Sequence, residues 1–333
     1  MKRVDNLFEQ ITDLNNLKFA YLKALKGKRY TPEVLIYTKR IDKNLFNLKI
    51  QLENETYNHG KYRQFKIYDP KERLITAASF EDRIIHHAIM NILEPVFEKQ
   101  FIFHTYACRK GKGTHKAVDY ASKKAKQCEY FLKLDVRKYF DNVNHAVLKA
   151  KLFRIIKDDK CLRLLFSIID SYGDGNKQLP IGNLTSQFFA NFYLSSMDHM
   201  VLETLKPHGY VRYMDDVIIF EDSKKRLLEI YNVLNDFVVN KLQLTFKQPV
   251  INKCVNGIPF LGFLIKRNSI SILSKNWKRK IRKLKQMDKE CCKVNESDLY
   301  NRYSNMFNCK NLQLKLKSPS HHKNYSKVPL PVR

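Results

Sequence analysis

The sequence predicts an α+β fold in which helices pack on one face of a sheet. Stretches rich in apolar and β-branched residues at 130–136 and 210–220 are typical of strands, and apolar positions with a helical period lie between and around them. The 333 residues are enough for about two domains with a sizeable core. A hydrophobic fraction of 44% and an aromatic fraction of 12% exclude a mainly disordered chain.

Helices dominate the expected structure of the first third of the chain. Residues 1–60 have the pattern of amphipathic helical pieces, and apolar residues recur at helical spacing from 79 to 97. Ser79 and Asp82 form a capping pair for the helix expected at 79–97. A Gly-Lys-Gly loop then leads through Thr114, a good N-cap, into a basic helix that ends near Cys128.

Strands and helices alternate further along the chain. The apolar strand 130–136 carries Asp135 at its end, and the hairpin 210–220 carries Asp215 and Asp216 at its tip. The other expected elements are a helix at 144–156, a loop at 173–183, a long helix at 185–205, a helix at 224–241 and a second β-rich stretch that contains Gly257 and Gly262.

The charge of the chain indicates a polyanionic partner. Lys and Arg number 61 against 33 Asp and Glu, which gives a formal net charge of +28. A small soluble domain needs a net charge of only about 2 to 8, so nucleic acid is the expected partner. Between residues 275 and 293, nine Lys or Arg stand against two acidic residues, which predicts a helix with a basic face in a separate lobe. A solvated helix face is the alternative interpretation.

The sequence argues against membrane and secreted classes. The longest uncharged run, 178–197, contains Pro180 and Gly182 and is unsuited to cross a bilayer as a helix. Asp5 and Glu9 interrupt any signal-peptide core. The seven cysteines contain no C-x-x-C pair, so reduced thiols fit better than disulfides or zinc. We therefore expect a cytoplasmic protein.

Three carboxylates stand at strand ends, where an ionised group is costly unless something compensates its charge. Asp135 ends an apolar strand, and Asp215 and Asp216 repel one another at the hairpin tip. A polar turn is the alternative for an Asp-Asp pair, but Tyr-Met-Asp-Asp arises by chance in only about one of a thousand chains of this length. Adjacent strands that carry these groups would suit two Mg²⁺ ions, or Mn²⁺ in their place, about 3.5–4 Å apart.

At this point the chain resembles a known family. Tyr-Met-Asp-Asp at 213–216 and Leu-Asp-Val-Arg-Lys-Tyr-Phe at 134–140 resemble motifs C and A of reverse transcriptases. Segments similar to two fingers motifs, motif B and the primer grip of that family follow the right order, at 70–75, 106–113, 179–187 and 260–263. The resemblance covers roughly residues 65–266. It implies a right-hand polymerase fold with fingers at 1–128, a palm at 129–266 and a short helical thumb with the C-terminal tail at 267–333.

The resemblance also implies roles for individual residues. It assigns catalysis to Asp135, Asp215 and Asp216, and the metal ions to these three residues with Val136. The residues that it implies for the primer grip are Phe260, Leu261 and Gly262, and those for contacts with the nucleic-acid backbone are Lys278, Arg279, Arg282 and Lys283. The residues that it implies for the incoming deoxynucleotide are Lys71, Arg73, Arg109, Val136, Phe140, Ile181, Gly182, Gln187 and Lys247.

Several of these nucleotide-binding assignments have a physical reason and an alternative. Arg73 offers a planar fork to phosphate oxygens, which a lysine lacks, and Phe140 would floor the sugar pocket and exclude a 2′-hydroxyl. Gly182 would let the backbone approach the nucleotide closely, and Lys247 would donate a proton to pyrophosphate. The alternatives are a solvated face for Lys71 and Arg109 and core packing for Phe140 and Ile181.

Motif B points to one branch of the family. The form Ile181-Gly182-x-x-x-Ser186-Gln187 resembles the reverse transcriptases of diversity-generating retroelements. That resemblance implies error-prone copying of a template-repeat RNA at adenines, for mutagenic retrohoming, and an accessory variability protein, a basic helical-bundle oligomer, as partner. The alternatives are a bacterial reverse transcriptase of another lineage, such as a retron-type or antiphage defence enzyme, and a nucleic-acid scaffold without activity.

Overall fold

A four-stranded sheet lies at the centre of the computed structural model, which describes residues 3–68 and 72–274. Its strand order is β4-β5-β3-β6, and each neighbouring pair is antiparallel. The central strand β5 is apolar at four consecutive positions, as expected of a strand that is buried on both faces. The strands are β3 (Tyr130–Asp135), β4 (Gly209–Tyr213), β5 (Asp216–Glu221) and β6 (Val250–Lys253).

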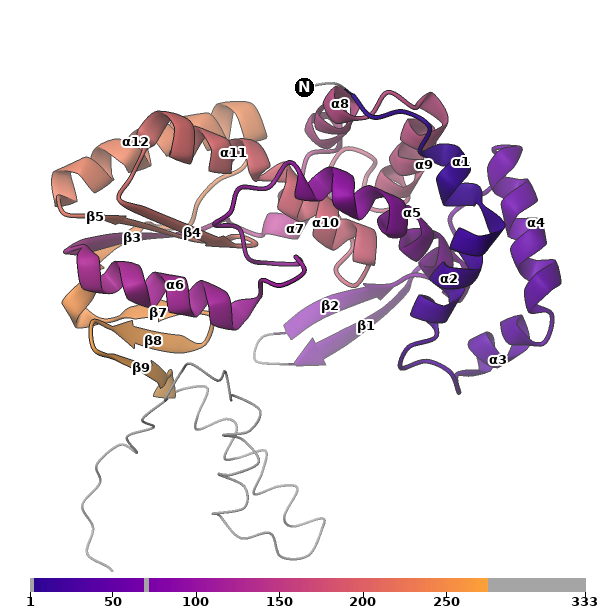
Figure 1. Cartoon of the computed structure of the whole chain (residues 1–333), viewed down its shortest axis with the longest axis horizontal. Helices are drawn as coiled ribbons and strands as arrows, with labels where there is room; N and C mark the ends of the chain where they lie inside the picture. The colour runs from indigo at the N-terminus through magenta and orange to yellow at the C-terminus, as the bar shows by residue number, and fades with distance from the viewer. Residues whose placement is uncertain (1–2, 69–71, 275–333) are drawn as a thin grey trace, which may run out of the picture.

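Helices cover both faces of this sheet, which corrects the expectation of helices on one face (Figure 1). The helix α12 (Lys224–Leu242) shares one buried cluster with Val217 and Ile219 of β5. The helix α6 (Thr114–Gln127) shares a second buried cluster with Ile218 of the same strand. Because successive side chains of a strand point to opposite faces, the run Val-Ile-Ile-Phe requires apolar cover on both sides.

A three-stranded sheet lies against α6 on the side away from the central sheet (Figure 1). It begins after a short 3₁₀ turn at Cys254–Asn256 and is antiparallel throughout. Its strands are β7 (Ile258–Phe260), β8 (Phe263–Lys266) and β9 (Ser269–Ile272).

The N-terminal part of the chain packs around α5 (Phe80–Glu98). The backbone N–H of Asp82 donates to Ser79 Oγ (3.1 Å), and Ser79 Oγ donates to Asp82 Oδ2 (2.6 Å), so the predicted capping pair is confirmed. A two-stranded hairpin extends from this part (Figure 1). Its strands and the helices around α5 are β1 (Arg63–Tyr68), β2 (Glu72–Ala77), α1 (Phe8–Thr12), α2 (Leu14–Ala24), α3 (Pro32–Thr38) and α4 (Ile41–Glu53).

Two helix predictions differ in detail from the structure. The segment 185–205 is divided into α10 (Leu184–Tyr193), α11 (Ser195–Met200) and a π-helical turn (Val201–Leu205). At the break, Ser195 Oγ donates to the Phe192 carbonyl (2.7 Å), a local bond that competes with the helical ladder. Of the remaining helices, α8 (His145–Ile155) agrees with the prediction, α7 (Tyr139–Asn142) is a single short turn, and α9 (Asp159–Asp170) was not predicted.

The second difference concerns the start of α6. Its N-cap is Gly113 and not Thr114. The Thr114 hydroxyl instead donates to Tyr213 Oη (3.3 Å), at the end of β4. This contact joins the first turn of α6 to the strand that precedes the Asp-Asp pair.

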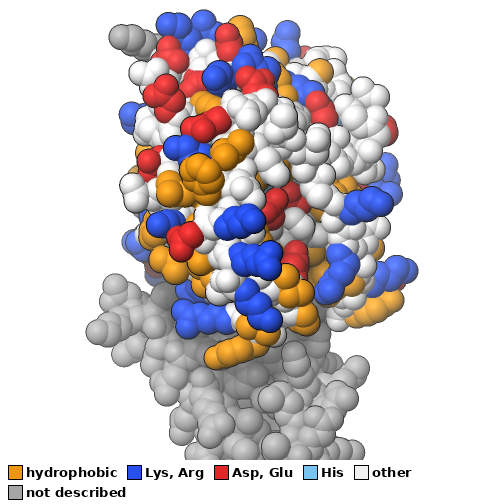
Figure 2. Space-filling model, turned by 90° about the vertical axis from the view of Figure 1, so that its right-hand side faces the viewer, with side chains coloured by type: hydrophobic (Ala, Val, Ile, Leu, Met, Phe, Trp, Pro, Cys, Tyr) orange, Lys and Arg blue, Asp and Glu red, His pale blue; other side chains and the backbone are white. Residues whose placement is uncertain are grey.

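The end of the molecule formed by α2, α3 and α4 carries cations beside exposed apolar side chains, and Figure 2 shows this face. Tyr30 is 90% exposed and Ile36 70% exposed. The cations of this face contribute to the positive charge of the chain, to which a polyanion is attracted. Among the described residues, no helix has the length and apolar character needed to span a bilayer.

Burial on both faces of β5 predicts a matched pair of stability losses. Ile218→Ala and Ile219→Ala should each lower the free energy of unfolding by about 2–5 kcal/mol, because both side chains are fully buried, in different clusters. Urea denaturation measures both losses. Val250→Ala on β6 is the control, because its side chain is 49% exposed, and it should cost less than about 1 kcal/mol. A small loss at either isoleucine would mean that one face of the strand is open.

Candidate active site

The three predicted carboxylates meet at one edge of the central sheet. Asp135 is the last residue of β3 and Asp216 the first residue of β5, and the register pairs them directly. Directly opposite residues of antiparallel strands have Cα atoms about 4.5–5.5 Å apart. Asp215 lies in the turn between β4 and β5, after Met214, whose φ is 54°. The fold therefore brings together residues that are some 80 positions apart in the chain.

This concentration of negative charge alters how the carboxyl groups titrate. Burial raises the pKa of Asp215 to about 6, and the neighbouring charges of Asp216 and Asp135 act in the same direction. Burial also raises the pKa of Asp216, while the ammonium of Lys133 opposes that shift. The positive charge near these carboxyl groups is therefore too small to offset their burial and mutual repulsion.

Two lysines supply part of that positive charge. Lys247 Nζ lies 2.6 Å from Asp135 Oδ1, and its backbone N–H donates to the Asp135 carbonyl (2.8 Å). Lys133 Nζ lies 3.6 Å from Asp216 Oδ1 and donates to the Pro259 carbonyl (2.8 Å). Lys247 was predicted, whereas Lys133 was missed. Its signal in the sequence is a charged residue inside an apolar strand, two positions before Asp135.

The donor set suits a hard divalent cation. Carboxylate oxygens are the ligands that Mg²⁺ and Mn²⁺ prefer. Within the described residues, Asp135 Oδ1 is buried and receives no well-directed hydrogen bond, although Lys247 Nζ forms an ion pair with it. Val136 has an alkyl side chain without a ligand atom, so it can offer a metal only its main-chain carbonyl. Asp135, Asp215, Asp216 and that carbonyl therefore fit the predicted metal set.

A second group of metal-ligand types lies at the opposite end of β3 and β5. Ligand atoms of Cys128, His208 and Asp222 lie within 4.8 Å of one another, although their positions in the sequence show no ligand spacing. The His208 and Asp222 side chains are more than half exposed and form an ion pair (3.1 Å). An ordinary surface pair accounts for this contact, and we assign no metal to it.

Backbone hydrogen bonds join the motif B loop, residues 179–183 before α10, to β2 and to α7. The Thr76 N–H donates to the Ile181 carbonyl (2.8 Å), and the Leu179 N–H donates to the Phe140 carbonyl (2.8 Å). Gly182 has a φ of 133°, and a Cβ at that position would lie 2.7 Å from the Thr76 carbonyl oxygen, so only glycine fits. These bonds join Phe140, through Leu179, to the loop that contains Ile181 and Gly182.

A cavity of about 770 Å³ lies beside this segment. Gly182 and Gln187 line it, together with residues of β1 and β2 such as Arg63 and Ile75. Gln187 is exposed, and its side-chain oxygen accepts a weak bond from Cys108 Sγ (3.5 Å). Gly182 and Gln187 therefore face open space between the hairpin and α10, whereas Ile181 is not among the residues that line this cavity.

The predicted triphosphate cations have different surroundings. Arg73 is exposed on β2, and among the described residues no ion pair engages it. Lys71 lies outside the described residues. Arg109 is bound within the fold, because its Nε donates to both Glu98 oxygens (2.8 and 2.9 Å) and its Nη1 donates to two backbone carbonyls. Its side chain is only 8% exposed, and these contacts favour a role in stabilising the loop.

The predicted primer grip is the tight turn between β7 and β8. Phe260 is fully buried, and Leu261 and Gly262 have φ values of 47° and 90°. Because Lys133 binds the carbonyl of Pro259, this turn is joined to the strand that carries Asp135. The four predicted backbone-binding cations, Lys278, Arg279, Arg282 and Lys283, lie outside the described residues.

The chain is similar to proteins of one family. Residues 66–265 match the family described as "Reverse transcriptase (RNA-dependent DNA polymerase)". Protein YkfC of Escherichia coli (strain K12) is 24% identical over 322 residues, which cover 80% of this chain and 84% of YkfC. Group II intron-encoded protein LtrA of Lactococcus lactis subsp. cremoris is 26% identical over 140 residues, which cover 40% of this chain and 23% of LtrA.

Two further comparisons complete this set. The uncharacterized 91 kDa protein in cob intron of Schizosaccharomyces pombe is 27% identical over 175 residues, 50% of this chain and 21% of that protein. The chain thus spans most of YkfC but less than a quarter of these two intron proteins. Among solved structures, apo telomerase from Candida Tropicalis superposes with a TM-score of 0.49 at 12% identity, over 63% of this chain and 47% of that chain.

The raised pKa of Asp215 predicts an effect on stability in the absence of metal. The folded chain, with a pKa of about 6, binds more protons than the unfolded chain, with a pKa of 3.8, at pH values between the two. Stability therefore falls as the pH rises from about 4 to about 6. Asp215→Asn should stabilise the protein at pH 7.5 in EDTA by about 1–2 kcal/mol, after allowance for the partial exposure of this carboxyl.

Urea denaturation across this pH range measures the effect. The gain from Asp215→Asn should shrink as the pH falls from 6 to 4 and disappear below about pH 3, where the wild-type carboxyl is protonated in both states. Asp236→Asn, at an exposed position on α12, is the control and should show no such trend. If Asp215→Asn left stability unchanged at pH 7.5, burial and the neighbouring carboxylates would not be raising the pKa of Asp215.

Proposed function

The chain belongs to the reverse transcriptase (RNA-dependent DNA polymerase) family, and we propose that it extends a primer 3′-hydroxyl with deoxynucleotides on an RNA template. One observation carries this proposal, the register that sets Asp135 opposite Asp216 with Asp215 in the adjoining turn. That edge lies within the segment that matches the family. A scaffold without activity would have no need to gather three carboxylates against their mutual repulsion.

We assign the parts of a right-hand polymerase to the chain as follows. Residues 1–128 form the fingers, residues 129–266 the palm, and residues 267–333 the thumb and tail. The central sheet supports this division, because it carries all three carboxylates inside the proposed palm. The cations at 278–283 would follow the phosphates of the primer–template duplex, a contact that weakens with salt.

Asp135, Asp215, Asp216 and the Val136 carbonyl are the proposed ligands of two Mg²⁺ ions, with Mn²⁺ as the alternative. Bound there, the metal acidifies the primer hydroxyl and stabilises charge on the leaving pyrophosphate. The protein itself holds the carboxylates in place through the pairing of β3 with β5. Lys247 stands beside Asp135, where it can hold a proton for the pyrophosphate.

The incoming deoxynucleotide is proposed to bind between the hairpin and motif B. Arg73 and Lys71 would contact the triphosphate, and Arg73 is exposed and available for it. Phe140 would form the floor under the sugar, since its backbone is tied to Leu179 in motif B. We leave Arg109 out of this set because its guanidinium is already bound to Glu98 and two carbonyls.

We further propose that the template is the RNA repeat of a diversity-generating retroelement and that copying is error-prone at adenines. The support is the motif B string with Ile181, Gly182 and Gln187. Fidelity is a difference between transition-state energies, and a branched alkyl side chain cannot form the hydrogen bond that a Gln amide would offer near the nucleotide. The proposed partner is the accessory variability protein, and the proposed location is the cytoplasm.

A second candidate is a reverse transcriptase of another bacterial lineage, such as a retron-type, defence or intron enzyme. The similarity to LtrA, whose name describes a group II intron-encoded protein, favours the intron branch. The sequence of the cDNA distinguishes the two candidates, because only the retroelement proposal predicts errors concentrated opposite template adenines.

Primer extension on an RNA template tests the proposed activity. Asp135→Asn and Asp216→Asn keep the shape of each side chain but remove a charge, so each should lower kcat by about 10²–10⁴-fold. Asp236→Asn, exposed and remote on α12, is the matched control and should keep wild-type activity. Full activity in either site variant would refute the proposed role of the carboxylates.

Sequencing of the cDNA tests the proposal for Ile181. Ile181→Gln should reduce misincorporation opposite template adenine by about tenfold, because a hydrogen bond of about 1 kcal/mol or more becomes available for discrimination. The backbone of the loop should persist, since the Ile181 carbonyl accepts the bond from Thr76 whatever the side chain. Val239→Gln at an exposed position on α12 serves as control, and an unchanged adenine error rate would contradict the proposal.

A further inference from the structure

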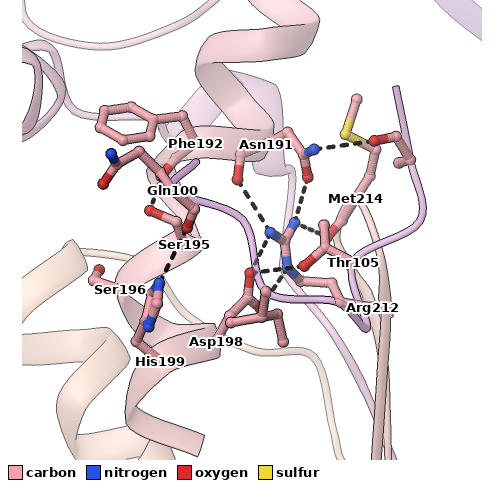
Figure 3. Close-up of polar contacts among 12 residues, drawn as sticks. Gln100, Thr105, Asn191, Phe192, Ser195, Ser196, Asp198, His199, Arg212 and Met214 are labelled. Atoms are coloured by element: carbon pink, nitrogen blue, oxygen red, sulfur yellow. Dashed lines mark hydrogen bonds and ion pairs between the residues drawn. The ribbon is translucent and has the colours of Figure 1, made fainter. Parts of the chain in front are cut away.

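The turn that carries Asp215 must keep its shape although the charges on it repel one another. Met214 has a φ of 54°, a left-handed conformation that a non-glycine side chain adopts only when its surroundings hold it. The support reaches the turn through the backbone, since Arg212 Nη1 donates to the Met214 carbonyl (3.1 Å). Figure 3 shows this contact and the residues behind it.

Arg212 is fully buried, and all five of its guanidinium N–H groups have acceptors. Its Nε and Nη2 donate to the two oxygens of Asp198 (2.6 and 2.5 Å). Its Nη1 and Nη2 also donate to the side-chain and main-chain oxygens of Asn191 (2.8 and 3.1 Å). The bond to Met214 uses the last donor, so the guanidinium has one orientation available to it.

Asp198 is held as firmly as the arginine that it binds. Its side chain is 0% exposed, and its two oxygens also accept bonds from Tyr210 Oη (2.6 Å) and Thr105 Oγ1 (3.1 Å). Asn191 Nδ2 donates to the Ala107 carbonyl (3.0 Å). The buried group therefore joins α10, α11, β4 and the segment before α6 at the back of the catalytic turn (Figure 3).

Stability alone does not explain a buried ion pair at this place. Well-packed apolar residues of similar volume often stabilise a protein as well as a buried pair or better, because both charges must leave water. What the pair provides is a single geometry, since a planar fork with every donor occupied cannot rotate. That property matters most next to a turn whose carboxylates would otherwise move apart.

We propose that Arg212 is a positioning residue for the polymerase reaction, which, with Asp198 and Asn191, sets the Met214 carbonyl and so the distance of Asp215 and Asp216 from Asp135. This inference rests on the proposed function, but it concerns residues that touch neither metal nor substrate. It predicts that a loosened turn weakens divalent-metal binding first and turnover as a result, with little effect on binding of the deoxynucleotide.

Arg212→Lys tests the proposal in the full-length protein. The lysine keeps a positive charge against Asp198 but lacks the fork that reaches Asp198, Asn191 and Met214 together. We expect the Mg²⁺ concentration for half-maximal primer extension to rise about tenfold and kcat to fall about 10–100-fold, with the KM for deoxynucleotide changed less than about threefold. Mn²⁺ binding, followed by electron paramagnetic resonance without substrate, should weaken by about tenfold, or about 1.4 kcal/mol.

Arg226→Lys is the matched control. Arg226 is an arginine of α12 whose Nη2 donates to the Leu205 carbonyl (2.9 Å), a backbone contact away from the carboxylates and from the cavity beside motif B. It should share any stability loss that comes from shortening an arginine bound to a carbonyl, but it should keep wild-type Mg²⁺ and Mn²⁺ requirements. If Arg212→Lys fails to fold, Asn191→Ser takes its place, because it loosens the same guanidinium without leaving a charge unpaired.

The outcomes separate this inference from the proposed function. A folded Arg212→Lys protein with wild-type Mn²⁺ affinity and Mg²⁺ requirement would overturn the positioning role, even if the wild type is an active polymerase. If the wild type extends no primer, the proposed function fails, while the Mn²⁺ measurement still decides whether Arg212 sets the metal site. Equal losses in Arg212→Lys and Arg226→Lys would indicate general destabilisation and also overturn it.

Discussion

The register between β3 and β5 is the constraint on which the candidate site depends. It places the last residue of one strand, Asp135, opposite the first residue of the other, Asp216, and a tight turn adds Asp215. Three carboxylates so close repel one another, and partial burial strengthens that repulsion. Lys133 and Lys247 offset part of the negative charge. The buried Arg212 donates to the Met214 carbonyl and supports the turn from behind.

The rest of the fold makes that register hard to change. Because β5 is buried on both faces, a slip of one residue would move each apolar side chain into the wrong cluster. The helix α12 on one side and α6 on the other therefore fix the strand that carries Asp216. The motif B loop is fixed in a similar way, since Gly182 allows it to lie directly against the Thr76 carbonyl.

A residue type that suits a function does not always perform it. Arg109 lies in a segment that resembles a fingers motif, yet its guanidinium binds Glu98 and two carbonyls inside the fold. Arg212 was not predicted as a site residue, yet its side chain donates to the backbone of the turn that carries Asp215. The difference between the two is the identity of their hydrogen-bond partners, which lie far away in the chain.

The sequence by itself determined the strands and helices around the site, the family resemblance and the three carboxylates, because these follow from local periodicity and from short strings of residues. The tertiary structure alone decided that both faces of the sheet are covered, that Lys133 faces Asp216, and that Asp198 binds Arg212. Each of these contacts joins segments that pair only after the chain has folded. A lone Lys in an apolar strand or a lone Asp in a helix indicates that a partner is needed, but the neighbours in sequence do not show which residue that partner is.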